Sequence, residues 1–296
     1  MRLDDLDPSN NVRDLGSGGG GGGGFSLLGL LPMVLGRGMG CGGVGMLVVV
    51  GLIYLAMSGG GLGGLLGGAG GPAATQQQSG AQAAKACDTQ EELFSCRVLA
   101  STEQVWGKVF AANGQTYRPP TLNFYQGGAK SGCGYASSAA GPYYCPPDQG
   151  VFLDTSFFNE LQNRFGAKGD AAAAYVIAHE VGHHIQNLTG DSERVQRIQQ
   201  SGNKAEGNAA SVRLELQADC YAGVWAKLSG RLEPGDIEEG LTAANAIGDD
   251  TLQRQSGGEV VPDSFTHGSA AQRQQWLRRG LETGDPTSCN TFAGAV

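Results

Sequence analysis

The stretch AYVIAHEVGHHIQ, residues 174–186, contains three of the four histidines in the chain. His179, Glu180 and His183 match the pattern H-E-x-x-H, in which x is any residue. Residues four apart lie on one face of an α-helix, so the two imidazoles can converge on one metal ion with Glu180 beside it. His184 is turned about 100° further around the helix, so we assign it to packing or to support of a ligand.

Two histidines make half of a catalytic zinc site, because such a site takes three protein ligands and keeps a fourth position open. The third ligand is either His267, the remaining histidine, or a carboxylate from RLELQADCYAG, residues 213–223. Here Glu215 and Asp219 are one helical turn apart, and small alanines beside them would allow a close helix contact. Asp219 would then accept a hydrogen bond from a ligand histidine and fix its tautomer. Without the H-E-x-x-H motif, the same pair would indicate an acidic surface stripe.

Several stretches together resemble one bacterial protein family. They are HEVGHH (179–184), ELQADCYAGVWA (215–226), AIGDD (246–250), VVPDSFTHGSAAQR (260–273), and GDP (284–286) before CNTF (289–292). The family is that of the bacterial putative neutral zinc metallopeptidases, whose members have a single amino-terminal membrane span. The likeness also covers NNVRDLG (10–16) and nearly everything from Cys87 to the end. The E-x-x-x-D spacing at Glu215 and Asp219 resembles the gluzincin metallopeptidases as well.

The resemblance implies a membrane-anchored zinc endopeptidase that acts on a peptide or protein substrate. It implies one Zn²⁺ per chain on His179, His183 and Glu215, with Glu180 as the general base toward a zinc-activated water. His267 resembles the histidine of a T-H-G motif near the substrate oxyanion, and a packing role is its alternative. Two other functions stay open: a non-catalytic zinc-containing binding or scaffold protein with this fold, and a metal-dependent hydrolase of a non-peptide bond.

The amino-terminal part differs from the rest in composition, since 25 of the 51 glycines fall within the first 71 residues. Residues 38–57 carry no charge and have the length that a spanning helix requires, so we predict one transmembrane helix there. We then expect a cytoplasmic Gly-rich tail over 1–37, a flexible Gly/Ala/Gln linker over 58–85 and a zinc metallopeptidase domain over 86–296. A cleaved export signal and a disordered Gly-rich arm are the alternatives for the apolar segment.

Flanking charges predict the orientation of that helix. Arg2, Arg13 and Arg37 precede it, and the first basic residue after it is Lys85. The positive-inside rule therefore predicts a single-pass protein of the bacterial inner membrane, with a cytoplasmic amino terminus and an extracytoplasmic catalytic domain. The net charge of −8, without a cluster of Lys and Arg in the domain, argues against nucleic acid as a partner. The oligomeric state stays open.

The domain from residue 86 contains an even set of six cysteines. In an oxidising compartment such a set is typical of three disulfides, although six cysteines allow 15 pairings. Nearest spacing favours the pairs Cys87–Cys96, Cys133–Cys145 and Cys220–Cys289. Reduced, buried cysteines are the alternative.

Capping signals and periodicity predict helices over 101–114, 170–190, 208–228 and 269–280, with N-caps at Ser101, Asp170 and Ser269. Apolar runs predict strands over 122–125 and 151–154, and a loop-rich hairpin within 131–147. Strands come early and helices dominate late, which favours the α+β class. Together with the resemblance, we expect a helix-rich, zincin-like metallopeptidase domain with a small β-sheet, preceded by one transmembrane helix.

Overall fold

The computed structural model describes residues 1–17, 85–294 and 296. The transmembrane helix predicted at 38–57 and nearly all of the linker predicted at 58–85 lie outside the described residues. Among the helices that are described, none has the length and apolar character needed to cross a membrane. The described residues form a helix-rich α+β fold with a small sheet, as predicted.

The main sheet has four strands in the order β1 (Val12–Ser17), β2 (Thr121–Gln126), β6 (Gly150–Leu153) and β5 (Tyr143–Cys145). The first three run parallel, whereas β5 is antiparallel to β6 and forms one edge. Both predicted strands are confirmed to within one residue. The hairpin begins earlier than expected, because it consists of β3 (Gly128–Ser131) and β4 (Gly134–Ser137), and the rest of 131–147 supplies β5.

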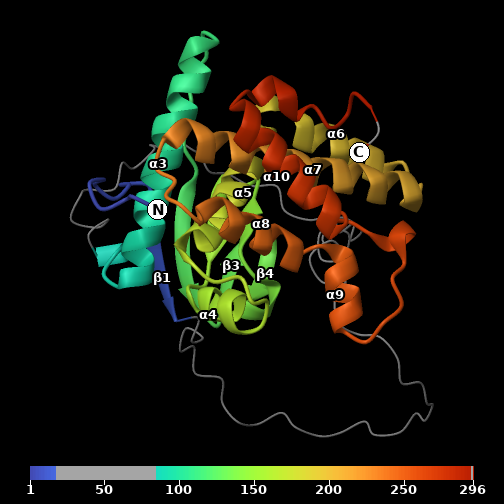
Figure 1. Cartoon of the computed structure of the whole chain (residues 1–296), viewed down its shortest axis with the longest axis horizontal. Helices are drawn as coiled ribbons and strands as arrows, with labels where there is room; N and C mark the ends of the chain where they lie inside the picture. The colour runs from blue at the N-terminus through green and yellow to red at the C-terminus, as the bar shows by residue number, and fades with distance from the viewer. Residues whose placement is uncertain (18–84, 295) are drawn as a thin grey trace, which may run out of the picture.

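Residues 1–17 belong to this fold, although we expected residues 1–37 to form a tail separate from the domain. Val12 pairs with Leu122 in the parallel ladder of β1 and β2, and it is fully buried together with Leu3 and Leu6. In Figure 1 the blue amino-terminal segment lies against α3 (Gln90–Ala112). Periodicity could not reveal this pairing, because it joins strands that are distant in the sequence.

Most helices extend beyond their predicted bounds. Helix α3 begins at Gln90 instead of Ser101, because Thr89 and Glu92 form the capping box at its start. Ser101 lies inside this helix, and its hydroxyl accepts a hydrogen bond from the Trp225 indole. Helix α7 (Lys204–Ser229) begins four residues before the predicted start at Asn208, because the side chain of Asn203 caps it.

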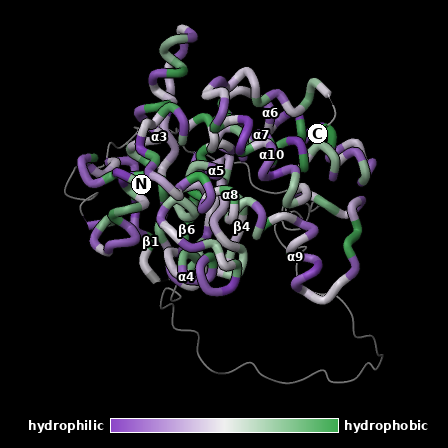
Figure 2. The backbone as a smooth tube through the Cα atoms, viewed as in Figure 1, coloured by the Kyte–Doolittle hydropathy of each residue, from purple (hydrophilic) through white to green (hydrophobic). Residues whose placement is uncertain are grey.

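Helix α5 (Asp170–Thr189) carries the H-E-x-x-H motif through the centre of the molecule (Figure 1). Asp170 is its first residue, whereas Gly169 is the N-cap, and Gly190 ends it in the left-handed conformation as predicted. The remaining helices surround it: α4 (Ser156–Asn163), α6 (Asp191–Gln200), α8 (Asp236–Ala246), α9 (Asp249–Gln255) and α10 (Ala270–Thr283). Figure 2 shows hydrophobic residues gathered around α5, while the outlying α9 is largely hydrophilic.

Small residues bring α5, α7 and α10 close together. A Cβ atom added to Gly182 of α5 would lie 3.0 Å from both Cα and O of Ala218 in α7. Gly223 of α7 and Gly280 of α10 likewise face the backbone of the opposite helix. Helix α10 starts at the predicted N-cap Ser269, which forms a capping box with Gln272. At these contacts the backbones of α5, α7 and α10 approach one another closely beside the H-E-x-x-H motif.

The three predicted disulfides are confirmed. Their pairs are Cys87–Cys96, Cys133–Cys145 and Cys220–Cys289. The last of them joins α7 to the short 3-10 helix at Pro286–Cys289, so it ties the end of the chain to the helix that carries Glu215.

Candidate metal centre

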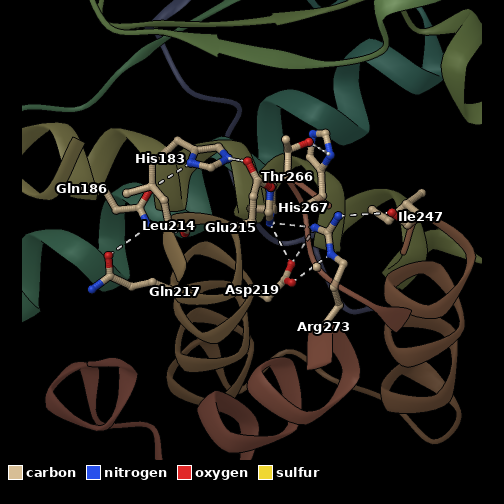
Figure 3. A network of polar contacts seen from close by, with 12 residues as sticks. His183, Gln186, Leu214, Glu215, Gln217, Asp219, Ile247, Thr266, His267 and Arg273 are labelled. Atoms are coloured by element: carbon tan, nitrogen blue, oxygen red, sulfur yellow. Dashed lines mark hydrogen bonds and ion pairs between the residues drawn. The ribbon is translucent and has the colours of Figure 1, made fainter. Parts of the chain in front are cut away.

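His179 and His183 of α5 face Glu215 of α7. The Nε2 atom of His179 lies 3.2 Å from Oε2 of Glu215, and Nε2 of His183 lies 3.4 Å from Oε1. One ligand atom from each of the three residues lies within 4.8 Å of the others. Ligands about 2.0–2.2 Å from a tetrahedral zinc ion are separated by about 3.3 Å, so these residues fit such an ion. Figure 3 shows His183 and Glu215 pointing toward each other across the two helices.

Each of the two histidines is held by a partner on its other nitrogen. Nδ1 of His179 lies 2.8 Å from Oδ1 of Asp219, and Nδ1 of His183 lies 2.8 Å from Oε1 of Gln186. An oxygen acceptor at Nδ1 requires a proton there, so Nε2 is the nitrogen that each ring would offer to a metal ion. Gln186 is itself fixed, because its amide nitrogen donates to the Leu214 carbonyl and to Gln217. Asp219 thus makes the hydrogen bond to His179 that we expected.

A buried arginine from the far end of the chain completes the support of His179. Arg273 of α10 is 2% exposed, and its Nε and Nη2 donate to the two oxygens of Asp219 at 2.9 Å each. The Tyr175 hydroxyl donates to the same carboxylate at 2.6 Å. Because Arg273 neutralises Asp219 in the interior, the carboxylate can be buried there as an ion. Figure 3 shows Arg273 and Asp219 paired below the metal-binding side chains.

The charges around His179, His183 and Glu215 favour a cation. Burial lowers the pKa of His179, but Asp219 and Glu215 outweigh this effect and raise it to about 10. Burial raises the pKa of Glu215, but the neighbouring histidines hold it well below its usual range. Both pKa shifts arise because positive charge is stabilised between the carboxylates of Glu215 and Asp219. A bound divalent ion would supply this charge in place of a proton.

Glu180 lies beside the three ligands and is only 7% exposed. Burial raises its pKa to about 7, with the Glu215 carboxylate adding to the rise and His179 acting against it. A carboxyl group that changes charge near neutral pH is well suited to accept and return a proton.

His184 lies outside the group of His179, His183 and Glu215 that could hold a metal ion. Its Nε2 donates to the Arg118 carbonyl at 2.6 Å, and its Nδ1 accepts from the Tyr144 hydroxyl at 2.9 Å. Burial lowers the pKa of His184, which keeps the ring neutral. This residue therefore joins α5 to the edge strand β5 and to the loop before β2.

His267 lies in the loop that leads into α10, with 43% of its side chain exposed. Its Nδ1 is 3.2 Å from Oδ1 of Asp249, while Oδ2 of Asp249 accepts the backbone N–H groups of Thr266, His267 and Gly268. Burial lowers the pKa of His267, but Asp249 and Glu215 raise it above its ordinary value. A protonated His267 would be a hydrogen-bond donor, whereas its contacts with Asp249 are equally those of a packed loop residue, so both expected roles stay open here.

Among the supporting residues of the site that were missed in the sequence are Tyr175, Gln186, Asp249 and Arg273. Gln186 follows His183 by three positions, so helical spacing was a usable signal for it. Asp249 and Arg273 belong to stretches that we cited for the family resemblance, but nothing local indicated their partners. An arginine in the polar stretch QRQQWLRR is typical of an exposed helix face, and only the packing of α10 on α7 makes Arg273 buried.

Comparisons with known proteins identify one family. The profile of the family described as "Putative neutral zinc metallopeptidase" matches residues 1–292. The uncharacterized protein YpfJ of Escherichia coli K12 is 52% identical over 206 residues, which cover 69% of this chain and 72% of YpfJ. The uncharacterized protein Rv2575 of Mycobacterium tuberculosis H37Rv is 45% identical over 218 residues, covering 68% and 71%. No solved structure matches the chain. The chain therefore belongs to the putative neutral zinc metallopeptidase family.

Proposed function

We propose that this protein is a zinc-dependent endopeptidase with one Zn²⁺ on His179, His183 and Glu215. The observation that carries the proposal is the convergence of these three side chains from α5 and α7, with the buried Glu180 beside them. A non-catalytic zinc protein of the same fold would have no use for a carboxyl group whose pKa is about 7 at this position.

Bound zinc would polarise the substrate carbonyl and lower the pKa of a water molecule at its open position. Glu180 accepts the proton of the attacking water and passes it to the leaving amine, for which a pKa near neutrality is suitable. His267, held by Asp249, donates a hydrogen bond to the developing oxyanion. Asp219 and Gln186 keep the two ligand imidazoles in the required tautomer.

An extended peptide would bind along β5. Of the strands that contain Tyr125 and Tyr143, β2 and β5, the second is the better candidate for pairing with a substrate, because β2 has neighbours on both sides. In the described part of the chain, β5 pairs with β6 alone, and Tyr144 of β5 contacts His184 beside the ligands. Main-chain hydrogen bonds to such an edge bind a backbone of almost any sequence.

Attachment to the membrane through the uncharged residues 38–57 is also proposed and rests on their composition; it does not require that they cross the bilayer once. The placement of the catalytic domain outside the cytoplasm is also proposed. Its support is the three disulfides, which persist in oxidising compartments.

The test is Glu180→Gln in the full-length chain, assayed with a peptide library and by metal analysis. We expect one zinc per chain in both proteins and loss of hydrolysis in the variant, because the amide retains the size of the side chain but accepts no proton. Glu193→Gln, on the exposed surface of α6, is the matched control and should keep full activity. Unchanged hydrolysis by Glu180→Gln would exclude the proposed base, and a zinc-loaded parent that cleaves nothing would favour the non-catalytic alternative.

A further inference from the structure

The amino-terminal segment 1–17 is built into the catalytic domain at its sheet. β1 pairs with β2 in parallel over Val12–Leu122, Arg13–Asn123 and Asp14–Phe124, and the pairing resumes at Ser17–Gln126 after an irregularity. Leu3, Leu6 and Val12 are 3%, 8% and 0% exposed and belong to the same hydrophobic core as α5 and α7. Burial of this kind is stabilising only while the segment and the domain are in contact.

Polar contacts tie the same segment to helix α3 and to the loop after α7. Glu103 of α3 accepts hydrogen bonds from Ser9 at 2.7 Å and from Asn11 at 2.8 Å. The other links are ion pairs of Asp4 with Arg97 of α3 at 2.7 Å and of Asp5 with Arg231, after α7, at 2.5 Å. The segment is therefore fixed along its length, and the family profile that matches the chain begins at residue 1.

A strand cannot pair across a membrane. Neighbouring strands of a sheet lie about 4.8 Å apart, whereas the hydrocarbon core of a bilayer is about 30 Å thick. A single crossing between residues 17 and 85, as expected from the apolar run at 38–57, would place β1 and β2 on opposite faces. A single crossing is therefore incompatible with the pairing of β1 with β2.

We propose that residues 1–17 and residues 85–296 lie on the same side of the membrane, in place of the cytoplasmic amino terminus expected from flanking charge. The inference concerns only the described residues at the two ends of the intervening segment. It is independent of the proposed peptidase activity, because it rests on β1 and not on the metal-binding residues.

Labelling of cysteines that are added one at a time to the full-length chain in living cells tests the proposal. Leu15→Cys in β1 and Val261→Cys in the loop before α10 replace side chains that are 46% and 48% exposed, so both thiols should be reactive in the folded protein. Each full-length variant is treated with a membrane-impermeant maleimide before and after cell disruption, and the parent chain gives the background. We expect both positions to label at the same stage. Labelling of only one of them in intact cells would overturn the proposal.

A crosslink provides a second measurement with the same chain. Arg13 and Asn123 are partners in the ladder, so cysteines at both positions have Cα atoms within the range of a disulfide. We expect the linked peptide in the full-length double variant Arg13→Cys/Asn123→Cys, found by mass spectrometry of membranes from oxidised cells. The control pair Arg13→Cys/Val261→Cys should give no such link. Absence of the Arg13–Asn123 link in a protein that still binds zinc would contradict a shared compartment.

Discussion

Gly182 lies between the two metal-binding histidines, and its replacement by alanine should disturb both the packing and the metal site. The added Cβ would lie 3.0 Å from Cα and O of Ala218 and 3.2 Å from its Cβ, whereas ordinary contacts are 3.4 Å or longer. Helix α7 must then retreat by a few tenths of an ångström. Ala218 stands between Glu215 and Asp219, so the retreat moves a ligand and the partner of His179 together.

The size of the effect follows from two opposing terms. Overpacking of a tight helix contact costs about 1–3 kcal/mol, and alanine in place of glycine inside a helix returns about 0.5–1 kcal/mol. We expect a net loss of about 0.5–2 kcal/mol, which lowers the melting temperature of a domain of this size by roughly 1–8 °C. Because the ligand geometry shifts, zinc affinity should fall by about tenfold to a hundredfold.

Thermal unfolding and competition with a chromogenic chelator measure the two effects. Gly107→Ala in α3 is the matched control, since a Cβ at Gly107 meets nothing within 4 Å. This control should be as stable as the parent or slightly more stable, with unchanged zinc affinity. If Gly182→Ala behaves like Gly107→Ala in both assays, the close contact of α5 and α7 does not set the metal geometry.

Four further outcomes are expected. Asp219→Asn should weaken zinc binding by about tenfold to a hundredfold, measured by chelator competition, because the amide no longer favours the required tautomer of His179; unchanged affinity would contradict that role. His267→Ala should lower kcat by about a hundredfold with little change in KM, as for loss of an oxyanion donor, whereas a change confined to KM would indicate substrate binding only. As the pH falls, kcat/KM should decrease with an apparent pKa between 4.5, the ordinary value of a glutamate, and about 7, because Glu180 acts as a base only when it is ionised. Burial raises the pKa of Glu180 to about 7, and bound zinc would lower it again. A kcat/KM that does not change over this pH range would exclude Glu180 as the base. Deletion of residues 1–17 should lower the stability of the domain by several kcal/mol in denaturant titrations, because a buried Leu or Val contributes about 1.5–3 kcal/mol, and an unchanged midpoint would show that β1 is dispensable.

The candidate metal-binding group could be proposed from the sequence because the relevant geometry is local. A spacing of four places His179 and His183 on one face of any helix, whatever surrounds it. The family resemblance then indicated Glu215 among the possible third ligands, and the spacing of four to Asp219 predicted its supporting contact. Disulfide pairing by nearest spacing was correct for the same reason in the two short loops.

The contacts that support the site depend on segments that meet only in the folded chain. Arg273 reaches Asp219 because α10 packs on α7, and Asp249 reaches His267 because the loop before α10 returns to the start of α9. The strands β1 and β2 pair although more than 100 residues separate them in the sequence. A six-residue strand has no local feature from which the strand beside it could be predicted. Side-chain periodicity reports which face of an element is apolar, but the choice of the surface that covers that face is made by the packing of the whole chain.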